Sequence, residues 1–215
     1  MDSYEGEVKV QSFERPLSLS NEKQMKYLNY SIPSIFMDKL QTFSHKNSVT
    51  LNDIGSALWG IALQKLNQTD DVVFGTILSG RNIDNFDASN ILGLCIQQIP
   101  LRVQNKRNHQ SMLDLVVKVK EDIEKAQNHL NCNLIEILSS SSIAQLSHKI
   151  LFNNYPFSSQ NLVDSNLPFQ LDNLKAEEIV EYDFGISFVP GEGRLDLEFN
   201  FNSQKNSDKD IEKCL

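Results

Sequence analysis

A near-continuous apolar run, Val72–Leu78, lies between Asp71 and Ser79 and constrains the fold more than any other feature of the chain. A run without polar alternation is typical of a strand that is covered on both faces. It closes on a tight Ser-Gly-Arg turn that ends at Arg81, and after a loop the segment Ile91–Val103 reads as a second strand. We therefore predict a buried strand pair within a layered architecture.

Two amphipathic helices are predicted from capping-box spacing. Thr50 and Asp53 have this spacing at the start of an apolar helix, and its many apolar positions predict that the helix is buried on several sides. These positions are Leu51, Ile54, Leu58, Trp59, Ile61, Ala62 and Leu66. Ser111 and Asp114 begin a surface helix whose apolar positions recur at helical intervals at Leu115, Val116, Val119, Ile123 and Ala126. Helices that alternate with buried strands favour a layered α/β fold.

The remaining alternating segments predict strands. Lys26–Ile32 alternates, and Ser34 is expected to cap a helix with Phe36, Leu40 and Phe43 on one face. Segments 181–189 and 194–201 also alternate, and Pro190–Gly193 between them reads as a turn, so we predict a late antiparallel hairpin. A short helix is expected to begin near Asp208.

Composition excludes several classes of function. A formal net charge of −8 and a pI near 5.0 disfavour nucleic-acid and anionic-membrane surfaces, and no stretch approaches the roughly 20 apolar residues of a membrane span. The start of the chain does not resemble a signal peptide, so we expect a cytoplasmic protein. The three cysteines and four histidines show no metal-ligand spacing, and no Gly-rich phosphate loop is present. Asp70 and Asp71 read as a solvated strand entrance.

Five segments in a fixed order resemble the C-terminal half of nonribosomal peptide synthetase condensation domains. Asp70–Arg81 and Ile91–Val103 resemble the family's Ser-Gly-Arg strand and its Gly-Phe-(Val/Ile)-Asn-Thr-x-Pro-(Leu/Val)-Arg run. The other three segments are Arg15–Gln24, His129–Ile137 and Ile150–Phe157. The family's catalytic HHxxxDG motif does not occur in the sequence.

The resemblance implies a fold and a division of the chain. We expect an α/β, chloramphenicol acetyltransferase-like lobe: a mixed sheet with helices packed on one face and the late hairpin. Residues 1–24 would be a linker that leads in from a missing N-terminal lobe, and residues 25–215 would form the C-terminal lobe.

The resemblance also implies where functional residues lie. No catalytic residue and no metal ligand is expected in this chain. Arg81 would form a salt bridge to the HHxxxDG Asp of the other lobe, supported by the turn at Ser79 and Gly80. A substrate tunnel wall is expected at Gly93, Cys95, Gln97, Gln98, Asn154 and Tyr155. Cys95, Gln97, Gln98 and Asn153 depart from the family motif, which fits either altered substrate preference or drift at packing positions.

The implied reaction joins a carrier-bound acyl or peptidyl thioester to the amine of an aminoacyl thioester. Phosphopantetheine arms would belong to partner carrier proteins, and no cofactor would be held by this chain. Expected partners are the N-terminal lobe, peptidyl carrier proteins and an adjacent adenylation domain. Alone, the lobe should be inactive and could homodimerise through its exposed lobe interface. Two alternatives remain: a noncatalytic docking module, or an epimerisation or cyclisation variant.

Overall fold

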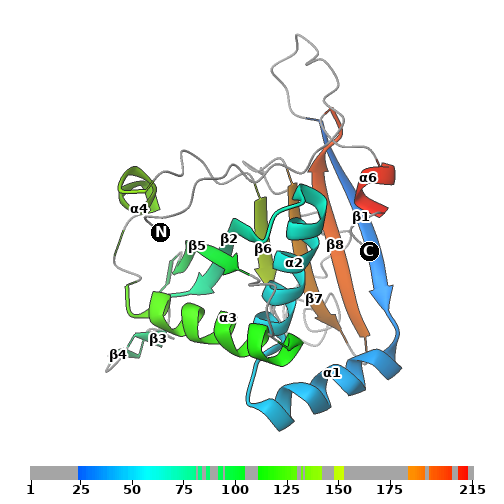
Figure 1. Cartoon of the computed structure of the whole chain (residues 1–215), viewed down its shortest axis with the longest axis horizontal. Helices are drawn as coiled ribbons and strands as arrows, with labels where there is room; N and C mark the ends of the chain where they lie inside the picture. The colour runs from blue at the N-terminus through cyan, green and yellow to red at the C-terminus, as the bar shows by residue number, and fades with distance from the viewer. Residues whose placement is uncertain are drawn as a thin grey trace, which may run out of the picture.

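The structure, a computed structural model, is built around a six-stranded sheet with the order β1-β8-β7-β6-β2-β5 (Figure 1). The strands are β1 Met25–Ile32, β2 Asp71–Ser79, β5 Ile96–Gln104, β6 His148–Phe152, β7 Phe184–Gly191 and β8 Arg194–Asn202. A separate two-stranded sheet joins β3 Asn82–Ile83 to β4 Phe86–Asp87. The described residues are 24–80, 82–83, 86–87, 92–93, 95–104, 111–129, 132, 134–141, 148–152, 184–191, 194–204 and 208–212.

The six-stranded sheet is mixed. β6 runs parallel to both β2 and β7, whereas β2–β5, β7–β8 and β1–β8 are antiparallel. The predicted buried strand, β2, therefore lies next to the edge strand β5 and carries residues that are almost fully buried. The late hairpin and the mixed sheet are both confirmed.

The hairpin differs in one detail from the sequence-based expectation. β7 continues through Pro190 to Gly191, which pairs with Arg194, so only residues 192–193 connect the two strands. The predicted four-residue turn was therefore too long, because alternation alone does not locate where pairing stops. On β8, the alternation is as expected: Leu195, Phe199 and Phe201 are buried in the core.

The three long helices, α1 Ser34–Asn47, α2 Leu51–Asn67 and α3 Met112–Gln127, pack on one face of the sheet. Figure 1 shows α2 and α3 in front of the strands. A Cβ added at Gly60 of α2 would lie 2.7 Å from the Val103 side chain of β5, so only glycine allows this close approach. The short helices are α4 Leu134–Ser139 and α6 Asp208–Glu212.

Local sequence signals position α2 and α3. Both begin with complete capping boxes, at Thr50 with Asp53 and at Ser111 with Asp114, as predicted. Hydrogen bonds from the Ser111 backbone and side chain lower the pKa of the Asp114 carboxyl below 3.8. Stability gained from this carboxylate is thus present above pH 3.8 and is lost as the pH falls through the lowered pKa.

Helix α1 departs from the prediction at its start. The N-cap is Pro33, whose side chain makes no capping hydrogen bond, and Ser34 is already the first helical residue. Met37 is the buried residue of this helix, whereas Phe36 is 53% exposed. Of the predicted face, Leu40 and Phe43 pack against the core as expected, and only Phe36 was wrong: Met37 takes its place, because both are apolar and the spacing does not separate them.

An aromatic cluster joins α2 to the hairpin. The ring centroid of Phe184 lies 5.2 Å from that of Trp59 and 6.0 Å from that of Phe199, and Phe184 is 1% exposed. Tyr30 of β1 meets Phe199 edge-on at 5.9 Å. Burial of these rings stabilises the contact between the central helix and strands that lie far away in the chain. Within the described residues, no helix is long and apolar enough to cross a membrane.

Candidate functional site

The candidate site lies around β2 and β5, where the sequence predicted functional residues. Residues that pair directly across a sheet share a face, so Val73, Gly75 and Ile77 lie on the same side as their partners Arg102, Pro100 and Gln98. Val103 and Leu101 lie on the opposite side, against the helices. We call the sheet surface turned away from α2 and α3 the rear face.

The predicted Ser-Gly turn closes directly on β5. Ser79 ends β2, and the Gly80 amide donates a 2.7 Å hydrogen bond to the carbonyl oxygen of Cys95. A Cβ on Gly80 would approach that same backbone oxygen to less than 3.0 Å, so the contact requires glycine. The turn thereby joins the end of β2 to the residue just before β5, and Arg81 lies outside the described residues.

Among the predicted tunnel-wall residues that the structure describes, Gln97 and Gln98 point to opposite faces of the sheet. Gln98 lies on the rear face, where its side-chain amide covers Gly75. Gln97 pairs with Leu78 and therefore points to the helix side, at an exposed end of the strand. Cys95 is half-buried in the approach to β5, and Gly93 has a φ of 155° that favours glycine. Asn154 and Tyr155 lie outside the described residues.

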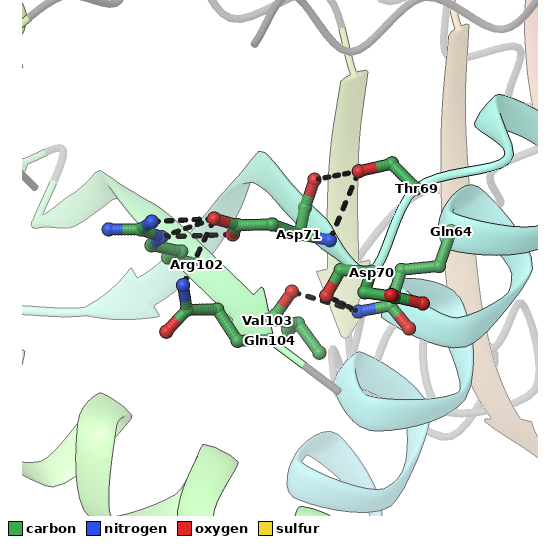
Figure 2. A network of polar contacts seen from close by, with 7 residues as sticks. All are labelled: Gln64, Thr69, Asp70, Asp71, Arg102, Val103 and Gln104. Atoms are coloured by element: carbon green, nitrogen blue, oxygen red, sulfur yellow. Dashed lines mark hydrogen bonds and ion pairs between the residues drawn. The ribbon is translucent and has the colours of Figure 1, made fainter. Parts of the chain in front are cut away.

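The structure adds a polar network that sequence reasoning missed. Arg102 donates from Nε to Asp71 Oδ1 at 2.9 Å, and its Nη2 forms a 2.5 Å ion pair with Asp71 Oδ2 (Figure 2). Gln104 Nε2 donates to the same carboxylate at 3.0 Å. Asp71 is thus a paired anion on the rear face and not a solvated strand entrance. A bidentate pair of this kind fixes the register of β2 against β5.

Helix α2 forms hydrogen bonds to the start of β2 and the end of β5 from the other side of the sheet. Gln64 is buried, and its Nε2 donates to the backbone oxygens of Asp70 at 3.0 Å and Val103 at 2.9 Å (Figure 2). Thr69 Oγ1 accepts from the Asp71 amide at 3.3 Å. These contacts join the end of α2 to the start of β2 and the end of β5. The two strands are therefore held rigidly where the rear-face ion pair forms.

We expect Arg102→Gln to lower the free energy of unfolding by about 1–2 kcal/mol, between values typical of exposed and buried charged pairs. The side chains of Arg102 and Asp71 are 18% and 29% exposed, so solvent screens the pair only in part. Urea denaturation measures this change. Arg194→Gln is a matched control: because Arg194 is largely exposed in its pair with Asp196, its loss should change stability by at most about 0.5 kcal/mol. Equal losses of stability in Arg102→Gln and Arg194→Gln would contradict the view that the Arg102–Asp71 ion pair stabilises the fold.

The site offers no metal centre among the described residues, where no three His, Cys, Asp or Glu side chains come together. Cys95 and Cys132 are free thiols within that part of the chain.

The mixed sheet with helices on one face defines a chloramphenicol acetyltransferase-like α/β fold. The epimerization domain from the third module of tyrocidine synthetase B has a TM-score of 0.66 at 16% identity, over 93% of this chain and 47% of that one. The X-domain from teicoplanin biosynthesis reaches 0.79 at 13% identity, over 98% and 48%, and it has also been solved in a complex with OxyB.

The family model of the condensation domain matches residues 11–215, and the chain belongs to this family. Bacitracin synthase 3 of Bacillus licheniformis is 31% identical over 175 residues, which are 79% of this chain and 3% of that protein. The chain thus spans a small part of this curated relative, and just under half of each of these two solved chains.

Proposed function

We propose that the chain is the C-terminal lobe of a condensation domain that forms an amide bond between two carrier-bound thioesters. The observation that supports the proposal is coverage: 98% of this chain matches 48% of the solved X-domain, as expected of one lobe that a second lobe of similar size would complete. The family motifs stand in order from Arg15 onward, and HHxxxDG does not occur among the 215 residues. Residues 1–24 would then be the linker and 25–215 the lobe.

In the proposed reaction, the amine of an aminoacyl thioester attacks the carbonyl carbon of an acyl or peptidyl thioester. A C–N bond forms, the C–S bond breaks, the amine loses one proton and the upstream carrier regains its thiol. The HHxxxDG histidine of the other lobe would orient the amine or accept its proton. This chain would contribute the opposite wall through the start of β5 and the residues before it, Gly93, Cys95, Gln97 and Gln98, of which Gln98 lies on the rear face and Gln97 on the helix side.

The proposed partners follow from the same chemistry. Peptidyl carrier proteins would deliver both substrates on phosphopantetheine arms, and this chain would hold no cofactor of its own. An adenylation domain would lie next to it in a cytoplasmic synthetase. Asn154 and Tyr155 would border the tunnel, since their segment resembles a family motif.

Arg81 is proposed to hold the two lobes together through a salt bridge to the HHxxxDG Asp. The Ser79–Gly80 turn supports this role, because the Gly80 amide, one residue before Arg81 in the sequence, is hydrogen-bonded to Cys95. We expect Arg81→Ala to weaken the association of separately produced lobes by about 1.5–3 kcal/mol, the value of a hydrogen-bonded charge. Sedimentation velocity measures the association, and Arg194→Ala serves as the control. We also propose that the chain alone homodimerises through the uncovered interface.

Two outcomes of the same sedimentation experiment would contradict these proposals. An association unchanged by Arg81→Ala would show that this residue makes no interlobe bridge. A strictly monomeric chain at high concentration would show that the uncovered surface does not mediate dimerisation.

The proposed function is tested with a protein in which both lobes are contiguous and two loaded carriers are supplied. Amide product would support condensation. A second candidate, a docking module without chemistry, is favoured by the OxyB complex of the X-domain with the same fold, and it predicts carrier binding without product. An epimerisation or cyclisation variant predicts an inverted or ring-closed product in place of the linear amide, so product analysis by mass spectrometry and chiral chromatography separates all three.

A further inference from the structure

Two glycines show how the central helix α2 lies on the sheet. A Cβ added to Gly55 would lie 3.2 Å from the ring of Phe188 on β7, and one added to Gly60 would lie 2.7 Å from the Val103 side chain on β5. Because β6 and β2 lie between β7 and β5, and α2 contacts both of them, the helix lies over these two inner strands. Helical positions that point between the directions of the two glycines therefore face β6 and β2.

Three polar residues occupy such positions. Asn52, Ser56 and Trp59 follow one another at intervals of four and three residues, so they form a single row along α2. With about 100° of rotation per residue, this row falls between the directions of Gly55 and Gly60 and points at the sheet. Ser56 is 0% exposed and Trp59 is 3% exposed, which agrees with this direction.

Thr76 of β2 points toward the same helix. Its partner on β5 is Ile99, a buried core residue, so both side chains lie on the helix side of the sheet. Thr76 itself is 1% exposed. It is also in register with Ile150 of β6, and Ile150 is in register with Ile186 of β7, so these residues mark one row across the sheet.

Ser56 lies over this row. On β7, the row passes between the two phenylalanines that lie against Gly55 and Trp59 of α2. Ser56 is between those two helical residues, on the side of α2 that is turned toward β6 and β2. The Ser56 and Thr76 side chains therefore enter the layer between helix and sheet from opposite sides.

The polar atoms of this layer are buried, and none has a hydrogen-bond partner among the residues that the structure describes. These atoms are Asn52 Oδ1, Ser56 Oγ, Trp59 Nε1 and Thr76 Oγ1. Buried polar atoms in folded proteins are nearly always paired, either with the protein or with ordered water. Because these atoms gather at one place, a shared partner explains all of them together.

We infer that ordered water is buried between α2 and β2, where it bridges Ser56 Oγ to Thr76 Oγ1 and extends along the row toward Asn52 Oδ1 and Trp59 Nε1. Water suits this set, because the amide oxygen only accepts, the indole N–H only donates, and water does both. Internal waters typically make about three hydrogen bonds to groups that the protein itself leaves unpaired. The water would join the central helix to the sheet, whichever reaction the domain performs.

Two substitutions that remove one hydroxyl each with little change of shape test the inference. If water pairs with these hydroxyls, Ser56→Ala and Thr76→Val should each lower the unfolding temperature of the full chain by about 2–4 °C, the effect of one neutral hydrogen bond in a chain of this size. Removal of an unpaired buried hydroxyl would leave that temperature unchanged or raise it. Scanning calorimetry measures the shift.

Ser139→Ala is the matched control for the loss of a hydroxyl. Ser139 Oγ donates to the Glu136 carbonyl oxygen at 2.9 Å in an exposed position, so this substitution should change the unfolding temperature little. Magnetic relaxation dispersion of the water oxygen-17 nucleus then measures long-lived internal water directly. We expect the wild type and Ser139→Ala to hold equal amounts, and the double variant Ser56→Ala/Thr76→Val to hold less.

Two results would overturn the inference. The first is an equal amount of long-lived internal water in the wild type and in the double variant. The second is an unfolding temperature that stays the same or rises in both single variants, because the two hydroxyls would then be unpaired in the folded chain. Both measurements are independent of amide formation, so neither result bears on the proposed function.

Discussion

Replacing Phe184 by alanine should lower the free energy of unfolding by about 3–5 kcal/mol, the typical cost of removing a fully buried phenylalanine. Phe184 is 1% exposed and lies between Trp59 of α2 and Phe199 of β8. Its removal would leave a cavity at the point where the central helix meets the hairpin. The aromatic contacts add to the loss, because offset and tilted ring pairs contribute beyond the area they bury.

Phe36→Ala is the matched control for this substitution. Phe36 is 53% exposed on α1, and the Lys39 ammonium lies 5.6 Å from the centroid of its ring. Its loss should cost about 1 kcal/mol or less, as is usual for an exposed cation–π pair. Chemical denaturation of both variants measures the difference. A cost for Phe184→Ala no larger than that for Phe36→Ala would contradict the packing of α2 against β7 and β8.

The second large effect is on activity: we expect this chain alone to form no amide above the uncatalysed rate from two loaded carriers. Loss of the proposed histidine base removes a factor of about 10²–10⁴. Loss of one tunnel wall removes the positioning of the two thioesters as well, which in well-oriented reactions is worth even more than the base. Quenched reactions analysed by mass spectrometry measure the product.

A control separates lost catalysis from a misfolded chain. The fragment used in that assay should unfold cooperatively and respond to Phe184→Ala as described above, which shows that the core around Phe184 is intact. Absence of product from a folded chain would then support the proposal that a second lobe carries the catalytic group. Product from the chain alone, at the rate of a two-lobe domain, would show that the catalytic group lies within these 215 residues.

Local signals in the sequence were sufficient for the elements that carry strong periodicity or caps. Both capping boxes, the buried strand β2 and the hairpin β7–β8 were predicted, because each depends on residues close together in the chain. On α1, where one predicted core residue was wrong, there is no side-chain cap, and Phe36 and Met37 are apolar neighbours. There, packing against the sheet chooses Met37, and the spacing does not.

Pairing between distant residues was beyond the sequence. Asp71 and Arg102 are separated by 31 positions, and only the β2–β5 register brings their side chains to the same face. The same register sends Gln97 and Gln98 to opposite faces, which a motif read as a continuous string cannot show. The alignment of Gly75 on β2 with Gly185 on β7, through Lys149 of β6, depends on two registers at once. The sequence hinted at this alignment only through one isolated glycine in each of the strands β2 and β7.

The most direct test of the half-domain proposal is complementation in trans. Adding a separately produced lobe that carries HHxxxDG to this chain, with two loaded carriers present, should give a one-to-one complex that forms the amide. The same lobe with its second motif histidine replaced by alanine should form the complex without product. Amide formation by this chain without any added lobe would contradict the account.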